Sequence, residues 1–376
     1  MIVTVTPNPA LDLTWHVERI VPGGTHRADM GAARAGGKGL NVARVAHAQG
    51  AAVVALATAG GATGTEFAAE LAAAGVPHEL VPVHAATRRS VALVDEHLGD
   101  TTVVNERGVN PTDAEWDALR AAVLRSLSED ERSGSVSGSL SEDERSETET
   151  KRGVSEDDRV SSRSDSVGAR STTPGKGAGS VGARPVLVVS GSLPPGAPDD
   201  LLPSLIRLGR DAGAIVIADT SGPALLAAAD AGATVLKPNA QELAEATGIA
   251  DPLAGACELL HRGASLILLS LGADGMLAVT ADEIVRARLA TRLAGNPTGA
   301  GDAGVAACAV LLAEGETDPE KILRRATAWS AAAVLMPLAG EIHPSWPELE
   351  AALILDRPTP HDLRPSNPPV QGKDPR

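Results

Sequence analysis

Short apolar runs alternate with amphipathic stretches over most of the chain. The runs are closed by Gly, Pro or polar residues, which predicts buried strands at 2–6, 53–57, 76–83, 186–190, 215–219, 234–239 and 266–272. Helical periodicity lies between them, for example at about 66–74, 111–127, 198–212, 252–262 and 319–335. Strands and helices that alternate at this spacing predict an α/β fold: a doubly wound, mainly parallel sheet with helices on both faces.

Two stretches follow a different pattern. Polar and apolar residues alternate at 11–35 and 85–105, with strands expected near 26–33 and 87–94, which is typical of strands exposed on one face. They do not suit a buried parallel sheet, so we expect them to form a small β lid. The large α/β domain is then expected to consist of 1–10, 36–84, 106–127 and 185–357.

Residues 128–184 contain hardly any apolar side chains. S-E-D-E-R occurs at 128 and 141, and S-V-G-A-R at 166 and 180. Such a composition cannot bury enough surface to offset its ordering entropy, so it predicts a disordered low-complexity insertion. Simple repeat expansion is the favoured interpretation over a regulatory segment. The Pro-rich end, 358–376, is expected to be a frayed tail.

Composition narrows the function classes. Four Trp, one Phe and no Tyr among 376 residues leave a core of Ala, Val, Leu and Ile. The net charge of −15 argues against nucleic-acid binding, and two cysteines give neither a disulfide framework nor a metal spacing. We find no signal peptide and no membrane-spanning run, so a cytoplasmic protein is expected.

The segment from Leu293 to Gly304, L-A-G-N-P-T-G-A-G-D-A-G, carries the main chemical signal. Amides of Gly299, Ala300 and Gly301 would open a helix and form an anion hole. A carboxylate there repels an anion, but Asp302 makes sense as a base for a hydroxyl that attacks a phosphate. From this stretch alone, two alternatives stay open: a plain helix cap, and a G-x-G-x-x-G dinucleotide fingerprint, which its late position disfavours.

Three further polar loops follow predicted strands or open helices. They contain Gly37, Lys38 and Asn41; Lys237, Asn239 and Glu242; and Ser270 and Gly272. In a doubly wound sheet such loops meet at the carboxyl ends of the strands, where ligands bind. No Walker A sequence occurs in the chain.

The motifs A-G-G-K-G-L-N-V-A (35–43) and N-P-T-G-A-G-D (296–302) resemble those of the ribokinase-like (PfkB) sugar kinases. The resemblance covers nearly all of the chain outside 128–184 and the tail. T-P-N-P-A-L-D (6–12), T-R (87–88), V-S-G-S-L-P-P-G (189–196) and K-P-N-x-x-E (237–242) are similar to the branch with 1-phosphofructokinase and tagatose-6-phosphate kinase. One departure is Ala303, where that branch commonly has Ser.

The resemblance implies a role for each matching residue. Asp302 would be the catalytic base, and Glu242 would hold magnesium through water. The predicted binding residues are, for the sugar phosphate, Asp12, Gly37, Lys38, Asn41, Arg88 and Arg27, and for ATP, Lys237, Asn239, Ser270 and Gly272.

The implied function is that of a hexose-phosphate kinase, a phosphotransferase with an alcohol acceptor that uses ATP and Mg²⁺. Fructose 1-phosphate giving fructose 1,6-bisphosphate is the first expectation, with tagatose 6-phosphate or fructose 6-phosphate as alternatives. The alternative of another class is a non-catalytic sugar-phosphate-binding regulator. We also expect a homodimer formed through the lid, because one lid face is apolar.

Overall fold

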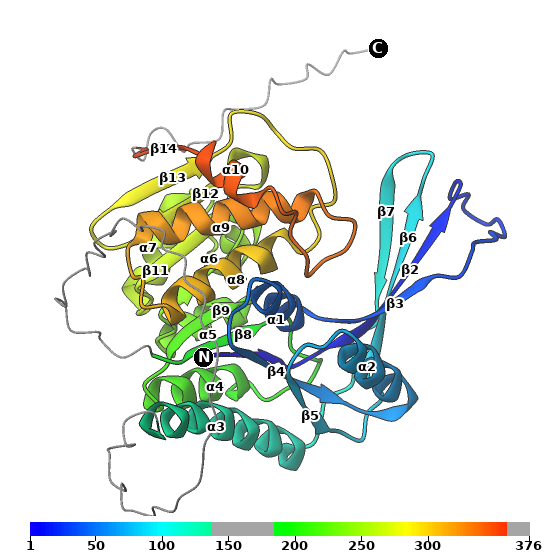
Figure 1. The fold of residues 1–376 in the computed structure, drawn as a ribbon, viewed down its shortest axis with the longest axis horizontal. Helices are drawn as coiled ribbons and strands as arrows, with labels where there is room; N and C mark the ends of the chain where they lie inside the picture. Colours follow the sequence, from blue (N-terminus) through cyan, green and yellow to red (C-terminus); the bar gives the residue numbers. More distant parts are fainter. Residues whose placement is uncertain (137–183, 359–376) are drawn as a thin grey trace, which may run out of the picture.

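A large mixed sheet forms the body of the computed structural model, which describes residues 1–136 and 184–358 (Figure 1). Parallel pairing joins the neighbours from β11 to β5, and antiparallel pairing joins β11 to β14 at one edge. The strand order is β14 (Ile354–Asp356), β13 (Ile284–Arg288), β12 (Met276–Val279), β11 (Leu266–Ser270), β10 (Val235–Leu236), β9 (Ile215–Asp219), β8 (Val186–Ser190), β1 (Ile2–Thr6), β4 (Val53–Ala59) and β5 (His78–Pro82).

Helices cover both faces of this sheet, because successive strand residues point to opposite sides. In β8, Val186 and Val188 join one buried cluster, whereas Leu187 and Val189 join the other. The first cluster is covered by α1 (Lys38–Ala48), α2 (Gly61–Ala73), α8 (Ala300–Ala313) and α9 (Pro319–Val334). The second is covered by α3 (Asp113–Val136), α4 (Leu201–Asp211), α5 (Pro223–Asp230), α6 (Ala240–Thr247) and α7 (Pro252–Arg262). The predicted fold class is confirmed.

A second sheet of four strands projects from the body (Figure 1). Its cross-strand register puts Asp12, Ser90 and Asn105 in one row and Leu13, Val91 and Val104 in the next. We call this sheet the lid sheet; its order is β3 (Ala32–Gly36), β2 (Ala10–Val17), β6 (Arg88–Asp95) and β7 (Asp100–Asn105). The predicted domain boundaries and the mobility of the lid stay predictions.

Several predicted boundaries differ from the structure, and two of the differences are large. Helix α3 continues to Val136, whereas the pattern predicts its end at Leu127 and an insertion from residue 128. The second lid strand is β3 at Ala32–Gly36, not 26–33. The rest of the predicted insertion and the predicted tail fall in 137–183 and 359–376, outside the described residues.

The order of the strands locates the binding edge. From β1 the chain moves outward through β4 and β5, and after α3 it returns to the other side of β1 with β8 and β9. The boundary between β1 and β8 is therefore a topological switch point, where crevices form at the carboxyl ends of strands. Those ends carry Thr6, Ser190 and Asp219. Within 1–136 and 184–358, no helix is both long and apolar enough to cross a bilayer.

Candidate active site

A cleft of about 2060 Å³ lies at this edge, between the large sheet and the lid sheet. Pockets for one small ligand usually measure about 300–1,000 Å³, so the cleft has room for two ligands. Arg27 is exposed in the loop between β2 and β3 and does not line the cleft. The predicted site residues that do line it are Asp12, Gly37, Lys38, Asn41, Arg88, Lys237, Asn239, Glu242, Ser270, Gly272, Gly299, Ala300, Gly301 and Asp302.

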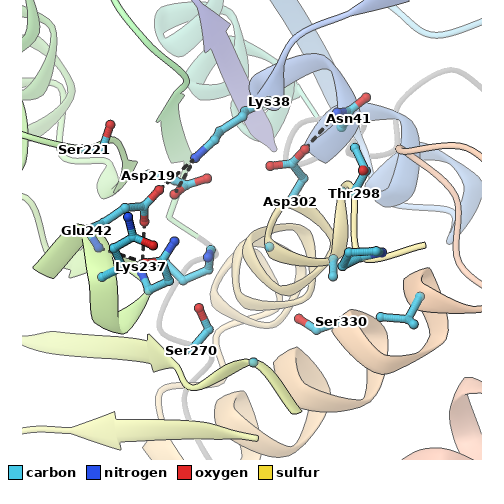
Figure 2. A pocket seen from close by; sticks show the side chains of 18 of the residues that line it. Lys38, Asn41, Asp219, Ser221, Lys237, Glu242, Ser270, Thr298, Asp302 and Ser330 are labelled. Atoms are coloured by element: carbon cyan, nitrogen blue, oxygen red, sulfur yellow. Dashed lines mark hydrogen bonds and ion pairs between the residues drawn. The ribbon is translucent and has the colours of Figure 1, made fainter. Parts of the chain in front are cut away.

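Asp302 stands in the first turn of α8, where its side chain is only 6% exposed. Its Oδ2 accepts a hydrogen bond of 2.8 Å from Nδ2 of the buried Asn41 in α1. Figure 2 shows the Asp302 carboxylate directed into the same space as Lys38 and Asp219. The contact therefore fixes a carboxylate between two helices that are far apart in the sequence.

Burial and the neighbouring Asp219 raise the pKa of Asp302 to about 7, although Asn41, Lys38 and Lys237 oppose the shift. A carboxyl group with this pKa is partly deprotonated near neutral pH and can accept a proton there. It is suited to general base catalysis.

The start of α8 offers free amide groups to the cleft. The backbone N–H groups of Gly299, Gly301 and Asp302 have no hydrogen-bond partner in the described part of the chain. The Ala300 N–H differs from the expectation, because it donates to Pro297 O at 3.2 Å. Free amides at a helix N-terminus attract anions, and Gly299, with φ of +84°, allows the tight turn that exposes them.

Lys237 follows β10, and its side chain reaches the same turn. A Cβ added at Gly301 would lie 3.0 Å from Lys237 Nζ, so the glycine makes room for the ammonium group. Lys237 is only 4% exposed, yet its side chain makes no hydrogen bond or ion pair with any described residue. A buried cation and free amides thus converge beside Asp302.

Asp219, at the end of β9, is a site residue that the sequence analysis missed. It is 1% exposed, accepts a hydrogen bond from Ser190 Oγ at 3.2 Å, and lies 3.4 Å from Lys38 Nζ. Burial is the largest effect on the pKa of Lys38 and lowers it, but Asp219, Asp302 and Glu242 together raise it. A carboxylate that ends the apolar run I-V-I-A-D was the available signal.

Asn239 and Glu242 form the capping box of α6. Asn239 Oδ1 accepts from the Glu242 N–H at 2.8 Å, and Glu242 Oε2 accepts from the Asn239 N–H at 2.9 Å. The K-P-N-x-x-E pattern therefore has a structural reason as well as a chemical one. Glu242 Oε1 remains outside the box and lies 4.0 Å from Lys38 Nζ.

One end of the cleft is built where the lid sheet joins the body. Burial raises the pKa of Asp12 to about 6 against the opposing charges of Arg88, Arg34 and Arg44. Its carboxylate packs directly on Gly36 of the neighbouring strand, where any Cβ would overlap it. Arg88, on β6, donates to the carbonyl oxygens of Asn8 and Glu106.

Ser270 and Gly272 line the other end. The Ser270 N–H donates to Pro238 O at 3.1 Å, which ties the end of β11 to the loop that precedes α6. Gly272 opens the 3-10 turn Gly272–Asp274 with φ of +60°. The loops that the sequence groups as candidates thus meet along one cleft.

Comparison with known proteins identifies the family of the chain. The family model described as "pfkB family carbohydrate kinase" matches residues 8–153 and 169–346. A 1-phosphofructokinase of Xanthomonas campestris is 32% identical over 87% of this chain and 89% of its own. An ATP-dependent 6-phosphofructokinase isozyme 2 of Mycobacterium tuberculosis is 32% identical over 89% of this chain and 84% of its own.

Solved structures share the fold of this chain. Phosphofructokinase-2 from Escherichia coli, in complex with fructose-6-phosphate, superimposes with a TM-score of 0.72 at 26% identity, covering 93% of this chain and 98% of that one. A ribokinase from Arabidopsis thaliana, at 19% identity and a TM-score of 0.62, shares the fold. The predicted enzyme class, a kinase that transfers phosphate to an alcohol group, is confirmed. The chain belongs to the pfkB family of carbohydrate kinases.

Proposed function

We propose that the protein phosphorylates fructose 1-phosphate with ATP and yields fructose 1,6-bisphosphate. The observation that carries the proposal is the buried Asp302, held by Asn41 beside free helix amides at one end of a cleft with room for two ligands. Relatives named 1-phosphofructokinase support the choice of sugar phosphate.

In the proposed reaction, Asp302 accepts the proton of the sugar hydroxyl as its oxygen attacks the γ-phosphorus of ATP. The bond from phosphorus to the bridging oxygen breaks, and ADP leaves with that electron pair. The amides of Gly301 and Asp302 and the ammonium of Lys237 stabilise the charge on the transferring phosphoryl group. The protein thus contributes mainly position and fixed charge.

Magnesium fits the carboxylates on the nucleotide side. Among the described residues, no group of three or more His, Cys, Asp or Glu could hold a metal alone. Mg²⁺ usually needs only one or two carboxylates, because substrate phosphates and water complete its shell. Glu242, through water, is the proposed contact, and the buried Asp219 adds negative charge nearby. When bound, the ion would neutralise the phosphates of ATP.

A coupled assay that measures ADP release tests the function. Purified protein is given ATP and Mg²⁺ with fructose 1-phosphate, fructose 6-phosphate or tagatose 6-phosphate, each over a range of concentrations. We expect the highest kcat/KM for fructose 1-phosphate, and product analysis should identify fructose 1,6-bisphosphate. Preference for fructose 6-phosphate or tagatose 6-phosphate would replace the substrate but keep the reaction class. Activity on unphosphorylated sugars alone would refute a sugar-phosphate kinase, and no turnover at all would favour a binding regulator.

A further inference from the structure

Seven basic residues line the cleft, and most of them already have partners. Arg286 and Arg288 face Asp356, Arg292 pairs with Asp274 at 3.1 Å, and Lys38 lies between Asp219 and Glu242. Arg88 donates through Nε and both terminal nitrogens to backbone carbonyls. Among residues 1–136 and 184–358, only Lys237 and Arg107 of this set have neither a hydrogen bond nor an ion pair from their side chains.

These two free cations belong to different parts of the cleft. Lys237 lies against the first turn of α8, where phosphoryl transfer is proposed. Arg107 lies on the loop that follows β7, next to the lid residues that face the cleft. Asn105, two residues earlier, shares a cross-strand row with Ser90 and Asp12. Arg107 is therefore on the sugar side.

The loop that carries Arg107 is anchored by its backbone. Asn8 Nδ2 donates to Arg107 O at 3.2 Å and also lies 3.4 Å from Ser192 Oγ. Gly108 follows with φ of +84°, and a Cβ there would lie 2.5 Å from Asn8 Oδ1. The neighbouring Glu106 forms no ion pair with Arg107, and its Oε2 accepts the Arg89 N–H at 2.7 Å. A fixed backbone thus presents an exposed guanidinium group at the cleft.

We propose that Arg107 binds the phosphate group that the sugar substrate already carries, as a specificity-determining residue. This inference rests on the proposed function. A guanidinium group binds phosphate through two parallel hydrogen bonds, and none of the five N–H donors of Arg107 is bonded to another described side chain or backbone group. Arg88 already donates from Nε and both terminal nitrogens to the carbonyl oxygens of Asn8 and Glu106. In this arrangement it holds the loop that carries Arg107 as well as binding the phosphate.

The test compares Arg107→Ala, Arg107→Lys and Arg89→Ala with the wild type. Arg89 is the matched control, because it has the same charge but lies outside the cleft lining. It is exposed on β6, the strand that neighbours β7. For each protein we would measure KM for fructose 1-phosphate and for ATP, kcat, and the Kd for fructose 1-phosphate without ATP by calorimetry.

We expect Arg107→Ala to raise both KM and Kd for the sugar phosphate about tenfold, the size of one charge-assisted contact. KM for ATP and kcat should stay within about twofold, and Arg107→Lys should recover part of the loss, because it keeps the charge without the fork. A response equal to that of Arg89→Ala would overturn the role of Arg107 while leaving the kinase function intact. A wild type without turnover of any sugar phosphate would refute both proposals.

Discussion

Asp302, the proposed catalytic base, keeps its place in the cleft at a cost to folding. Removing a carboxylate from water and placing it beside Asp219 disfavours its charged form, which is why its pKa rises to about 7. The hydrogen bond from Asn41 recovers only part of that cost. The residue is thus held in a state that favours accepting a proton.

Replacing Asp302 with Asn should abolish turnover and preserve binding. The amide has nearly the same shape and can still accept from Asn41, but it cannot take up a proton. We expect kcat to fall by about 10²–10⁴-fold with the Kd for ATP nearly unchanged, as measured by the ADP assay and calorimetry. Asp282→Asn, an exposed position outside the cleft lining, is the control. Near-normal turnover of Asp302→Asn would assign the base to another residue.

The raised pKa of Asp302 predicts how both activity and stability depend on pH. In the wild type, kcat/KM should fall as the pH drops through about 7, because the base becomes protonated. A carboxyl whose pKa is raised by folding binds protons more strongly in the folded state. Its destabilising effect therefore grows as the pH rises from about 4 to about 7. Thermal melts at pH 5 and pH 8 should show Asp302→Asn gaining Tm over the wild type mainly at pH 8.

Sequence reasoning found residues that stand in motifs and missed those that do not. Gly37, Lys38 and Asn41 of the first motif line the cleft, as do all four residues from Gly299 to Asp302. Asp219 and Arg107 belong to no recognised motif, so their importance depends on a tertiary environment that the sequence does not display. Arg27 was a candidate because of its positive charge, but it lies in an exposed loop and does not line the cleft.

At the scale of elements, the start of α8 depends on one backbone conformation. Gly299 adopts φ of +84°, and a Cβ there would lie 2.7 Å from Ala339 Cβ in the loop after α9. The same loop brings Gly340 against Asn41, where an added Cβ would lie 3.1 Å from Oδ1. The anion-binding turn and the partner of Asp302 therefore share one supporting loop.

Gly299→Ala should therefore impair catalysis beyond the cost of its backbone. Gly248→Ala is the matched control, because Gly248 also has a positive φ, +70°, but nothing lies within 4 Å of its added Cβ. We expect Gly248→Ala to cost about 1–2 kcal/mol of unfolding free energy with kcat unchanged. Gly299→Ala should also lower kcat about 100-fold, as the loss of an anion-hole donor does. Equal kcat values for the two variants would exclude a catalytic role for this turn.

The lengths of elements were predicted less well than their types. Buried strands were recognised because their apolar runs are short and bounded. The end of α3 was placed too early, because S-E-D-E-R was assigned to the disordered insertion although its Glu and Arg residues are good helix formers. Local composition could not decide between these two interpretations.

At the scale of the whole molecule, the lid sheet has one face that residues 1–136 and 184–358 cover incompletely. Leu13, Trp15, Val91 and Leu93 are half-buried rather than bare, and Leu13 packs on the core. Val104, in the same row as Leu13 and Val91, is 59% exposed. An apolar row that ends in solvent is typical of a surface covered by another subunit.

We therefore expect a homodimer in which lid sheets cover each other. Light scattering at micromolar concentration should give twice the monomer mass. The Val104→Glu variant should give the mass of a single monomer. Leu124→Glu, which puts the same charge on an exposed residue of α3, should leave the mass unchanged. A wild type that stays monomeric with and without substrate would contradict the dimer.

The two ends of strand β8 lie at opposite edges of the large sheet. The strand enters the sheet at Val186, beside Ile2, and ends at Ser190, on the edge that carries the cleft. The chain therefore returns to the sheet five residues of strand away from the cleft. An engineer could use this junction to graft a reporter domain onto the protein, and we expect such a graft to leave the geometry of the cleft unchanged.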